Sequence, residues 1–177
     1  ALPLCLARMG IDPAGYGRII AVNGGMIVLL QLPLTAFLSR FNRGRVVIGS
    51  SFIIGIGFAL TALAHHPPAF VGTVVIWTLG ELMQFPFCAA IVSDLAPARM
   101  RGRYMGVFGL SHSLAMAIGA PVGGEILART GSGVWIACLI SSAISAAMFF
   151  LIRKRLSLRH AAETVSAFPI DTIEKQT

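Results

Sequence analysis

The chain has 177 residues, of which 56% are hydrophobic and 12% are charged. Soluble domains carry about twice that share of charged residues, so the composition excludes an ordinary soluble protein. The net charge of +7 would also suit a nucleic-acid binder. However, the basic residues lie at the ends of long apolar runs and not together on one soluble face, which favours an integral membrane protein.

Five apolar runs, each 19 to 24 residues long, follow one another along the chain. As helices they would each reach about 30 Å, enough to cross the hydrocarbon core of a bilayer. They are residues 19–38, 46–64, 69–92, 104–127 and 134–152. Residues 1–7 are apolar but too short to cross, and are predicted to be the last part of a span. Because the connecting loops are short, we predict one all-α membrane bundle over residues 1–152, with no soluble domain.

Lysine and arginine are distributed unevenly between the two ends of this bundle. Three of them, Arg8, Arg18 and Arg129, lie at one end, and eleven lie at the other. The larger set consists of Arg40, Arg43, Arg45, Arg99, Arg101, Arg103, Arg153, Lys154, Arg155, Arg159 and Lys175. Cytoplasmic loops carry the excess of basic residues, so this end is predicted to be cytoplasmic. Residues 153–177 would then form a basic cytoplasmic tail, which we expect to be poorly ordered.

Other functional classes find no support in the sequence. It contains no phosphate-binding loop, no G-x-G-x-x-G and no Ser/His/Asp arrangement, so nothing predicts an ATPase, a hydrolase or any other enzyme, or a bound cofactor. The adjacent His65 and His66 precede two prolines and supply too few ligands for a metal site. The three cysteines lack C-x-x-C spacing and are predicted to be small core residues.

The segment after the third apolar run combines one acid, three arginines and a glycine-rich apolar stretch. It reads SDLAPARMRGRYMGVFGLSHSLAMAIGAPVGGEIL, residues 93–127. Its Asp-Leu-Ala-Pro, Arg-Gly-Arg-Tyr and Gly-Ala-Pro-Val-Gly-Gly elements resemble the loop between helices ten and eleven of major facilitator superfamily transporters, followed by helix eleven. A weaker likeness to the family pattern G-x-x-x-D-R-x-G-R-R lies in TAFLSRFNRG, residues 35–44. There Arg40 and Arg43 fit the pattern, but Ser39 stands where Asp is usual.

This resemblance implies that the chain corresponds to the C-terminal half of a twelve-helix transporter, from the end of helix seven through helix twelve. The drug/proton antiporter branch is the most similar. The implied activity is alternating-access transport of a small molecule, proton-coupled and of the efflux type, in a bacterial inner membrane. An N-terminal six-helix half is the implied partner, and we expect the 177 residues alone to be inactive. Residues 46–64 and 134–152, which hold nothing more polar than Ser or Thr, are the implied outer helices.

Glu81 lies near the middle of the third run. A charge there costs at least about 2.5 kcal/mol, so such residues face a cavity or a partner. Glu81 belongs to a stripe at helical spacing, predicted to face a cavity: Thr73, Trp77, Glu81, Gln84 and Cys88. Either Glu81 contacts substrate or takes up a coupling proton, or it forms a structural hydrogen bond to a neighbouring helix.

Two further helices carry polar residues at similar depth. His112 lies about 12 Å and Glu81 about 16 Å from the cytoplasmic end, so they could pair as a proton relay; alternatively, His112 bonds to a backbone carbonyl or a serine. Asn23 and Gln31 belong to a second stripe with Ile27 and Thr35. This stripe either lines the pathway or joins helices by hydrogen bonds worth about 0.6 kcal/mol each.

The remaining features concern packing and gating. A ridge of small residues predicts close approach of a neighbouring helix: Ser111, Ala115, Gly119 and Gly123, with a shorter ridge at Ser51, Gly55 and Ala59. Asp94 is predicted to form a state-dependent ion pair with the arginines of its loop, or to be a solvated acid. The loop motif comprises Asp94, Arg99, Arg101, Gly102 and Arg103, together with Arg40 and Arg43.

A rival hypothesis is a small membrane protein that scaffolds or modulates a partner without transporting anything. In that case Glu81 and its stripe would face another protein chain instead of water. Reaction of cysteines at positions 77, 81 and 84 with a water-soluble thiol reagent would distinguish the two hypotheses.

Overall fold

The structure is a computed structural model that describes residues 2–8, 10, 12–131 and 133–166. Six α-helices make up nearly all of this part of the chain, with one 3-10 turn, Ala98–Met100, before α5. The helices are α1 (Leu2–Arg8), α2 (Pro13–Leu38), α3 (Arg43–Thr61), α4 (Pro67–Leu95), α5 (Arg101–Thr130) and α6 (Gly133–Ser166). The described residues contain no strand.

Five of these helices are long and apolar enough to cross a membrane: α2, α3, α4, α5 and the part of α6 up to Ile152. The predicted all-α fold with five spans and a short first segment is therefore confirmed. Most helices extend past the predicted runs, because apolarity marks only the part of a helix that lies in hydrocarbon. The largest difference is in α6, whose backbone continues into the predicted tail as far as Ser166; residues 167–177 lie outside the described part.

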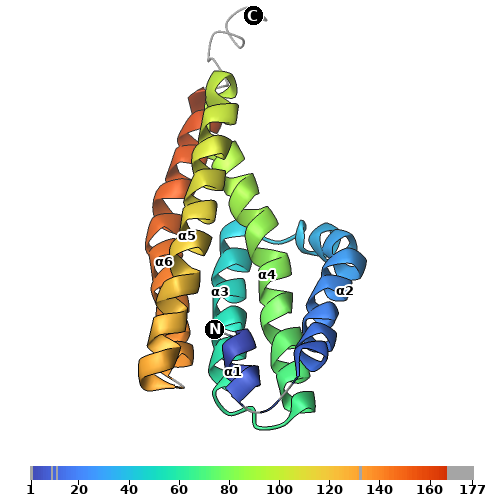
Figure 1. Cartoon of the computed structure of the whole chain (residues 1–177). Helices are drawn as coiled ribbons and strands as arrows, with labels where there is room; N and C mark the ends of the chain where they lie inside the picture. Colours follow the sequence, from blue (N-terminus) through green and yellow to red (C-terminus); the bar gives the residue numbers. More distant parts are fainter. Residues whose placement is uncertain (1, 9, 11, 132, 167–177) are drawn as a thin grey trace, which may run out of the picture.

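Local sequence signals explain where the helices begin and turn. Asp12 caps α2, because its Oδ1 accepts a hydrogen bond from the backbone N–H of Gly15 at 2.9 Å. Asn42 caps α3 in the same way, accepting from the N–H of Arg45 at 3.2 Å. Gly131, at φ +62°, ends α5 in a conformation that favours glycine. The short loops make successive spans run in opposite directions (Figure 1).

The helix α3 holds the bundle together, because it packs against both α4 and α6. Close approach at glycines makes this packing tight. A Cβ atom at Gly57 would lie 2.7 Å from the Cβ of Trp77, and one at Gly80 would lie 2.5 Å from Cγ1 of Ile54. On the other side of α3, Gly55 lies against Ser142 of α6. The shorter small-residue ridge thus packs closely, as its sequence predicts.

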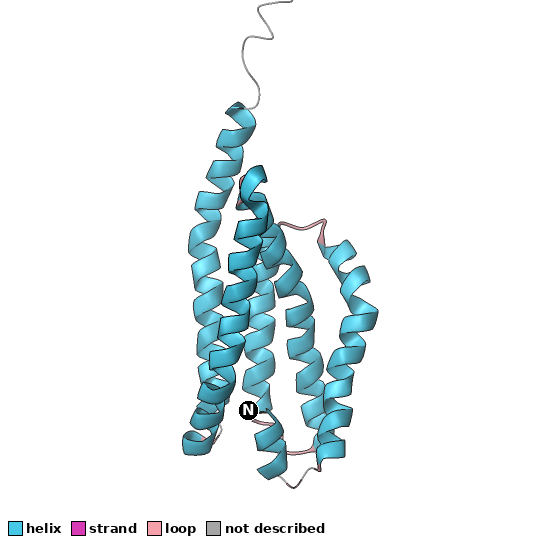
Figure 2. Ribbon diagram, turned by 45° about the horizontal axis from the view of Figure 1, so that its top comes forward, coloured by secondary structure: helices cyan, strands magenta, loops and turns pink. Residues whose placement is uncertain are grey.

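Aromatic rings join the same three helices. Phe58 of α3 stacks between Trp77 of α4, at 5.5 Å between ring centroids, and Trp135 of α6, at 6.2 Å. The other two spans are much less enclosed. The helix α2 lies at one side of the bundle and packs on α4 (Figures 1 and 2), whereas α5 makes only sparse contact with α4 and α6. The implied outer position of α3 and α6 concerns a complete transporter and stays a prediction.

Candidate functional site

A polar cluster joins α2 to α4 in the middle of the spans. The Nδ2 of Asn23 donates to Oγ1 of Thr78 at 2.9 Å and to Oε2 of Glu81 at 3.5 Å. Thr78 is fully buried, whereas Glu81 is exposed. The carboxylate of Glu81 is therefore held from one side, and no described residue is hydrogen-bonded to its Oε1.

The surroundings of Glu81 show which face of α4 it occupies. Phe85, one turn further along α4, contacts the rings of Phe108 and His112 on α5, with centroid distances of 5.6 and 5.2 Å. Asn23 reaches Glu81 from α2. Glu81 thus lies on the surface of α4 between α2 and α5, the two least buried spans.

The prediction that one stripe of α4 faces a cavity is wrong for Thr73 and Trp77, which are only 6% and 8% exposed. Trp77 stacks on α3, and Gln84 also turns to α3, where its Oε1 accepts hydrogen bonds from the hydroxyls of Ser50 and Ser51 at 3.3 and 3.4 Å. The reason is geometric. At about 100° per residue the stripe spreads over roughly 80° of the helix, and only Glu81, at its edge, escapes the contact with α3.

Gln31 serves as a structural contact between α2 and α4. Its Nε2 donates to the backbone carbonyl of Leu82 at 3.1 Å and to Oγ1 of Thr35, on its own helix, at 3.2 Å. In a regular helix the carbonyl of Leu82 would bond to the N–H of residue 86, but that residue is proline and has none. Gln31 therefore satisfies a carbonyl that Pro86 leaves without a helical partner.

The predicted pair of Glu81 with His112 is not formed among the described residues. His112 meets the ring of Phe85 edge-on, whereas Glu81 bonds to Asn23. The physical reason is depth, because His112 lies level with Phe85, one turn nearer the arginine-rich end than Glu81.

The acid at the end of α4 also has a different partner from the predicted one. Asp94 accepts a charged hydrogen bond from Nη1 of Arg43, at the start of α3. Among the described residues, none of the arginines in its own loop forms an ion pair. Asp94 is still part of α4 and faces α3, whereas the chain continues past it through Pro97 and the 3-10 turn before the other arginines. The two segments that resemble family motifs therefore meet in one ion pair; in the second of them, Arg40 lies over the ring of Phe37.

The longer small-residue ridge has no helix against it in the described chain. Ser111, Ala115 and Gly119 are exposed and Gly123 is half-buried, and a Cβ at Gly119 would meet nothing within 4 Å. The predicted close neighbour of this ridge is therefore not among the described helices. Gly102 is likewise open.

Sequence reasoning missed three participants: Thr78, which anchors Asn23, and the two serines that bind Gln84. The role of Thr78 could have been predicted from its spacing. It lies three residues before Glu81, and residues three apart are neighbours on the surface of a helix. Ser50 and Ser51 had none, because buried serines in membrane helices commonly bond to their own backbone, as both also do here.

Comparison with known proteins agrees with this arrangement of membrane helices. The model of the Major Facilitator Superfamily matches residues 1–173. The chain therefore belongs to this superfamily of membrane transporters.

Individual relatives share about a quarter to a third of their residues with the chain. It is 30% identical over 161 residues to "Uncharacterized MFS-type transporter YttB" of Bacillus subtilis, covering 88% of this chain and 40% of that protein. It is 26% identical to the "Na(+), Li(+), K(+)/H(+) antiporter" of Planococcus maritimus, covering 77% and 32% of the two chains. It is also 26% identical to "Multidrug resistance protein MdtH" of Klebsiella pneumoniae, covering 77% and 37%. The chain thus spans well under half the length of these relatives. No solved structure gave a significant match.

Proposed function

We propose that the chain forms one half of a proton-coupled secondary transporter that exports a small molecule by alternating access. The observation that carries this proposal is Glu81, an ionisable side chain exposed near the middle of a span. A charge facing hydrocarbon at that depth is unfavourable by at least about 2.5 kcal/mol. A second six-helix half, placed against α2 and α5, would enclose Glu81 in an aqueous cavity instead. Relatives named as a cation/proton antiporter and a multidrug resistance protein support this choice.

In this proposal Glu81 takes up the coupling proton or contacts the cargo. Asn23 donates to Oε2 only, so Oε1 is the atom available for a proton or a polar group of the cargo. Thr78 accepts from the same amide nitrogen, which fixes the orientation of Asn23. Protonation removes the charge and hence much of the cost of enclosing the side chain away from water, which would favour a change of state.

The ion pair between Arg43 and Asp94 is the proposed gate element. It joins the start of α3 to the end of α4 at the arginine-rich end, which the positive-inside rule assigns to the cytoplasm. Because both side chains are partly exposed, the pair contributes less than about 1 kcal/mol and can break and form during a cycle. Since the relatives are bacterial, a bacterial inner membrane is the proposed location, with the C-terminus in the cytoplasm.

The test is transport by membrane vesicles that contain this chain together with a matching N-terminal six-helix half. Glu81→Gln removes the charge and is expected to abolish proton-coupled transport or its pH dependence. Glu125→Gln is the matched control, because Glu125 is an exposed carboxylate on α5 that pairs with Arg129, outside the cluster. Wild-type rates and pH dependence in Glu81→Gln would overturn the proposal. The chain without the second half is expected to transport nothing.

The alternative is a protein that scaffolds or modulates a partner. The bare ridge of Ser111, Ala115 and Gly119 is the observation in its favour, because small residues suit close contact with another helix. The two functions differ at Glu81: a pathway requires water at this residue, whereas a scaffold seals it in a dry contact.

A further inference from the structure

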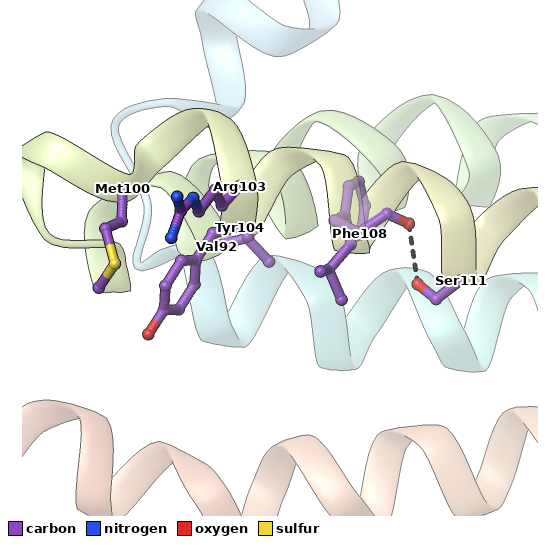
Figure 3. Close-up of a pocket in the computed structure, with 7 residues that line it drawn as sticks. Val92, Met100, Arg103, Tyr104, Phe108 and Ser111 are labelled. Atoms are coloured by element: carbon purple, nitrogen blue, oxygen red, sulfur yellow. Dashed lines mark hydrogen bonds between the residues drawn. The ribbon is translucent and has the colours of Figure 1, made fainter.

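A groove of about 530 Å³ lies beside the first turns of α5 (Figure 3). This volume is within the range of small-molecule sites, about 300–1,000 Å³. Its walls are mainly apolar, formed by Val92 at the end of α4 together with Met100, Val107 and Phe108. The rim carries Arg103 and Tyr104.

The groove itself is apolar along its length, and apart from Ser111 its polar side chains lie only at one end of it. Met100, Arg103 and Tyr104 lie together at the end nearest the start of α5, and Phe108 lies further along the helix, toward the middle of the span (Figure 3). Ser111, beside Phe108, offers no free donor, because its hydroxyl bonds to the carbonyl of Phe108 on its own helix. The charged side chain therefore lies at the start of α5, in the arginine-rich segment, and the apolar wall continues along the helix toward the middle of the span.

The polar end has an excess of positive charge. The segment from Asp94 to Arg103 contains one acid and three arginines, and that acid pairs with Arg43 at the start of α3. Among the described residues, no carboxylate pairs with Arg103. The guanidinium at the rim is thus available to an anion supplied from outside the described chain.

We propose that this groove binds an anionic phospholipid. The phosphate of the headgroup accepts hydrogen bonds from the guanidinium of Arg103, and one acyl chain lies along Val107 and Phe108. The positive charge of Arg103 favours a lipid with a negatively charged headgroup. The apolar wall along α5 favours a lipid with a long acyl chain. Because Phe108 also packs on Phe85 of α4, a bound lipid would brace the otherwise sparse contact between α5 and α4. The proposal does not depend on transport by the protein.

Native mass spectrometry of the purified full chain tests the headgroup. Phosphatidylglycerol and phosphatidylcholine with identical acyl chains are added in turn, and the lipid-bound fraction is measured. The wild-type chain is expected to retain phosphatidylglycerol preferentially. Arg103→Gln should weaken that binding about tenfold or more, because it removes a hydrogen bond between oppositely charged groups. Equal retention of the two lipids would overturn the proposal.

Arg101→Gln is the matched control, because Arg101 lies in the same first turn of α5, carries the same charge and does not line the groove. It should change binding less than twofold. If Arg101→Gln and Arg103→Gln weaken binding equally, the attraction is that of a general basic surface and the proposed site is wrong.

A second measurement needs no variant and so does not depend on the folding of Arg103→Gln. Bound long-chain phosphatidylglycerol is challenged with excess long-chain lipid or with excess dihexanoyl phosphatidylglycerol, which has the same headgroup and short chains. Only the long-chain competitor is expected to displace the lipid efficiently. Equal displacement by both would show that the apolar wall takes no part and would refute the proposal.

Discussion

Replacement of Gln31 by leucine tests the contact between α2 and α4 most sharply. In the native chain Gln31 donates to the carbonyl of Leu82, which Pro86 leaves without its helical partner. Leu82 is only 2% exposed, so water cannot readily replace the amide. Gln31→Leu should therefore destabilise the bundle by about 1–3 kcal/mol, the cost of a buried carbonyl left unsatisfied.

The loss of stability caused by Gln31→Leu should depend on whether residue 86 is proline. A loss caused only by poorer packing at position 31 would not depend on residue 86. In a Pro86→Ala background, the N–H of residue 86 can bond to the carbonyl of Leu82 within α4. Gln31→Leu should then cost only about 0.6 kcal/mol, the average for a side-chain hydrogen bond between membrane helices. The lost bond to Thr35 is common to both backgrounds and cancels in the double-mutant cycle.

Unfolding of the four chains in mixed micelles of increasing denaturing-detergent fraction supplies the free energies. The sequence has two tryptophans, Trp77 and Trp135, which are both buried against Phe58, so their fluorescence reports loss of the core. We expect a coupling energy of about 0.4–2.4 kcal/mol between Gln31 and Pro86, the difference between the two costs. Equal costs of Gln31→Leu in both backgrounds would refute the reasoning.

Three further predictions use the same assay. Gly80→Ala should destabilise the bundle by about 1–3 kcal/mol relative to Gly72→Ala. The Cβ of an alanine at position 80 would lie 3.0 Å from backbone atoms of α3, whereas one at position 72 would meet open space. Equal stabilities of the two variants would contradict the close packing. Phe58→Ala should cost about 3–5 kcal/mol by leaving a cavity between the two tryptophans, and a loss below 1 kcal/mol would show that the stack matters little. Asp94→Asn should cost less than about 1 kcal/mol, and less at high salt, because its ion pair is partly exposed; a large, salt-independent loss would contradict this.

The fold was largely predictable because apolarity and length determine which segments cross a bilayer. The five spans and the short first segment follow from that rule alone. Helix ends were less predictable, since a helix such as α6 can continue beyond its apolar run without any apolar signal. The close packing of α3 was foreseen at Gly55, whereas the contacts at Gly57 and Gly80 depend on how α3 and α4 cross, which spacing within one helix does not specify.

The site was predictable only in part. The spacing of residues along one helix determines where their side chains lie around that helix, but not which other helices pack against them. Glu81 and Gln84 lie one helical turn apart on α4. Glu81 is nevertheless exposed beside Asn23, whereas Gln84 accepts hydrogen bonds from serines of α3. The partner of Asp94 illustrates the same limit. Arg43 is 51 residues away in sequence, and only the pairing of α3 with α4 brings it nearer than the arginines of the adjoining loop.

The central claim is that water reaches Glu81 while the neighbouring stripe residues stay dry. The most direct measurement is labelling by a membrane-impermeant thiol reagent in the complete transporter, after Cys5, Cys88 and Cys138 have been replaced by alanine. Glu81→Cys is expected to react readily, and Trp77→Cys, at a position buried against α3, is expected to remain unlabelled in the folded protein. An unreactive cysteine at position 81 in every transport state would contradict the account.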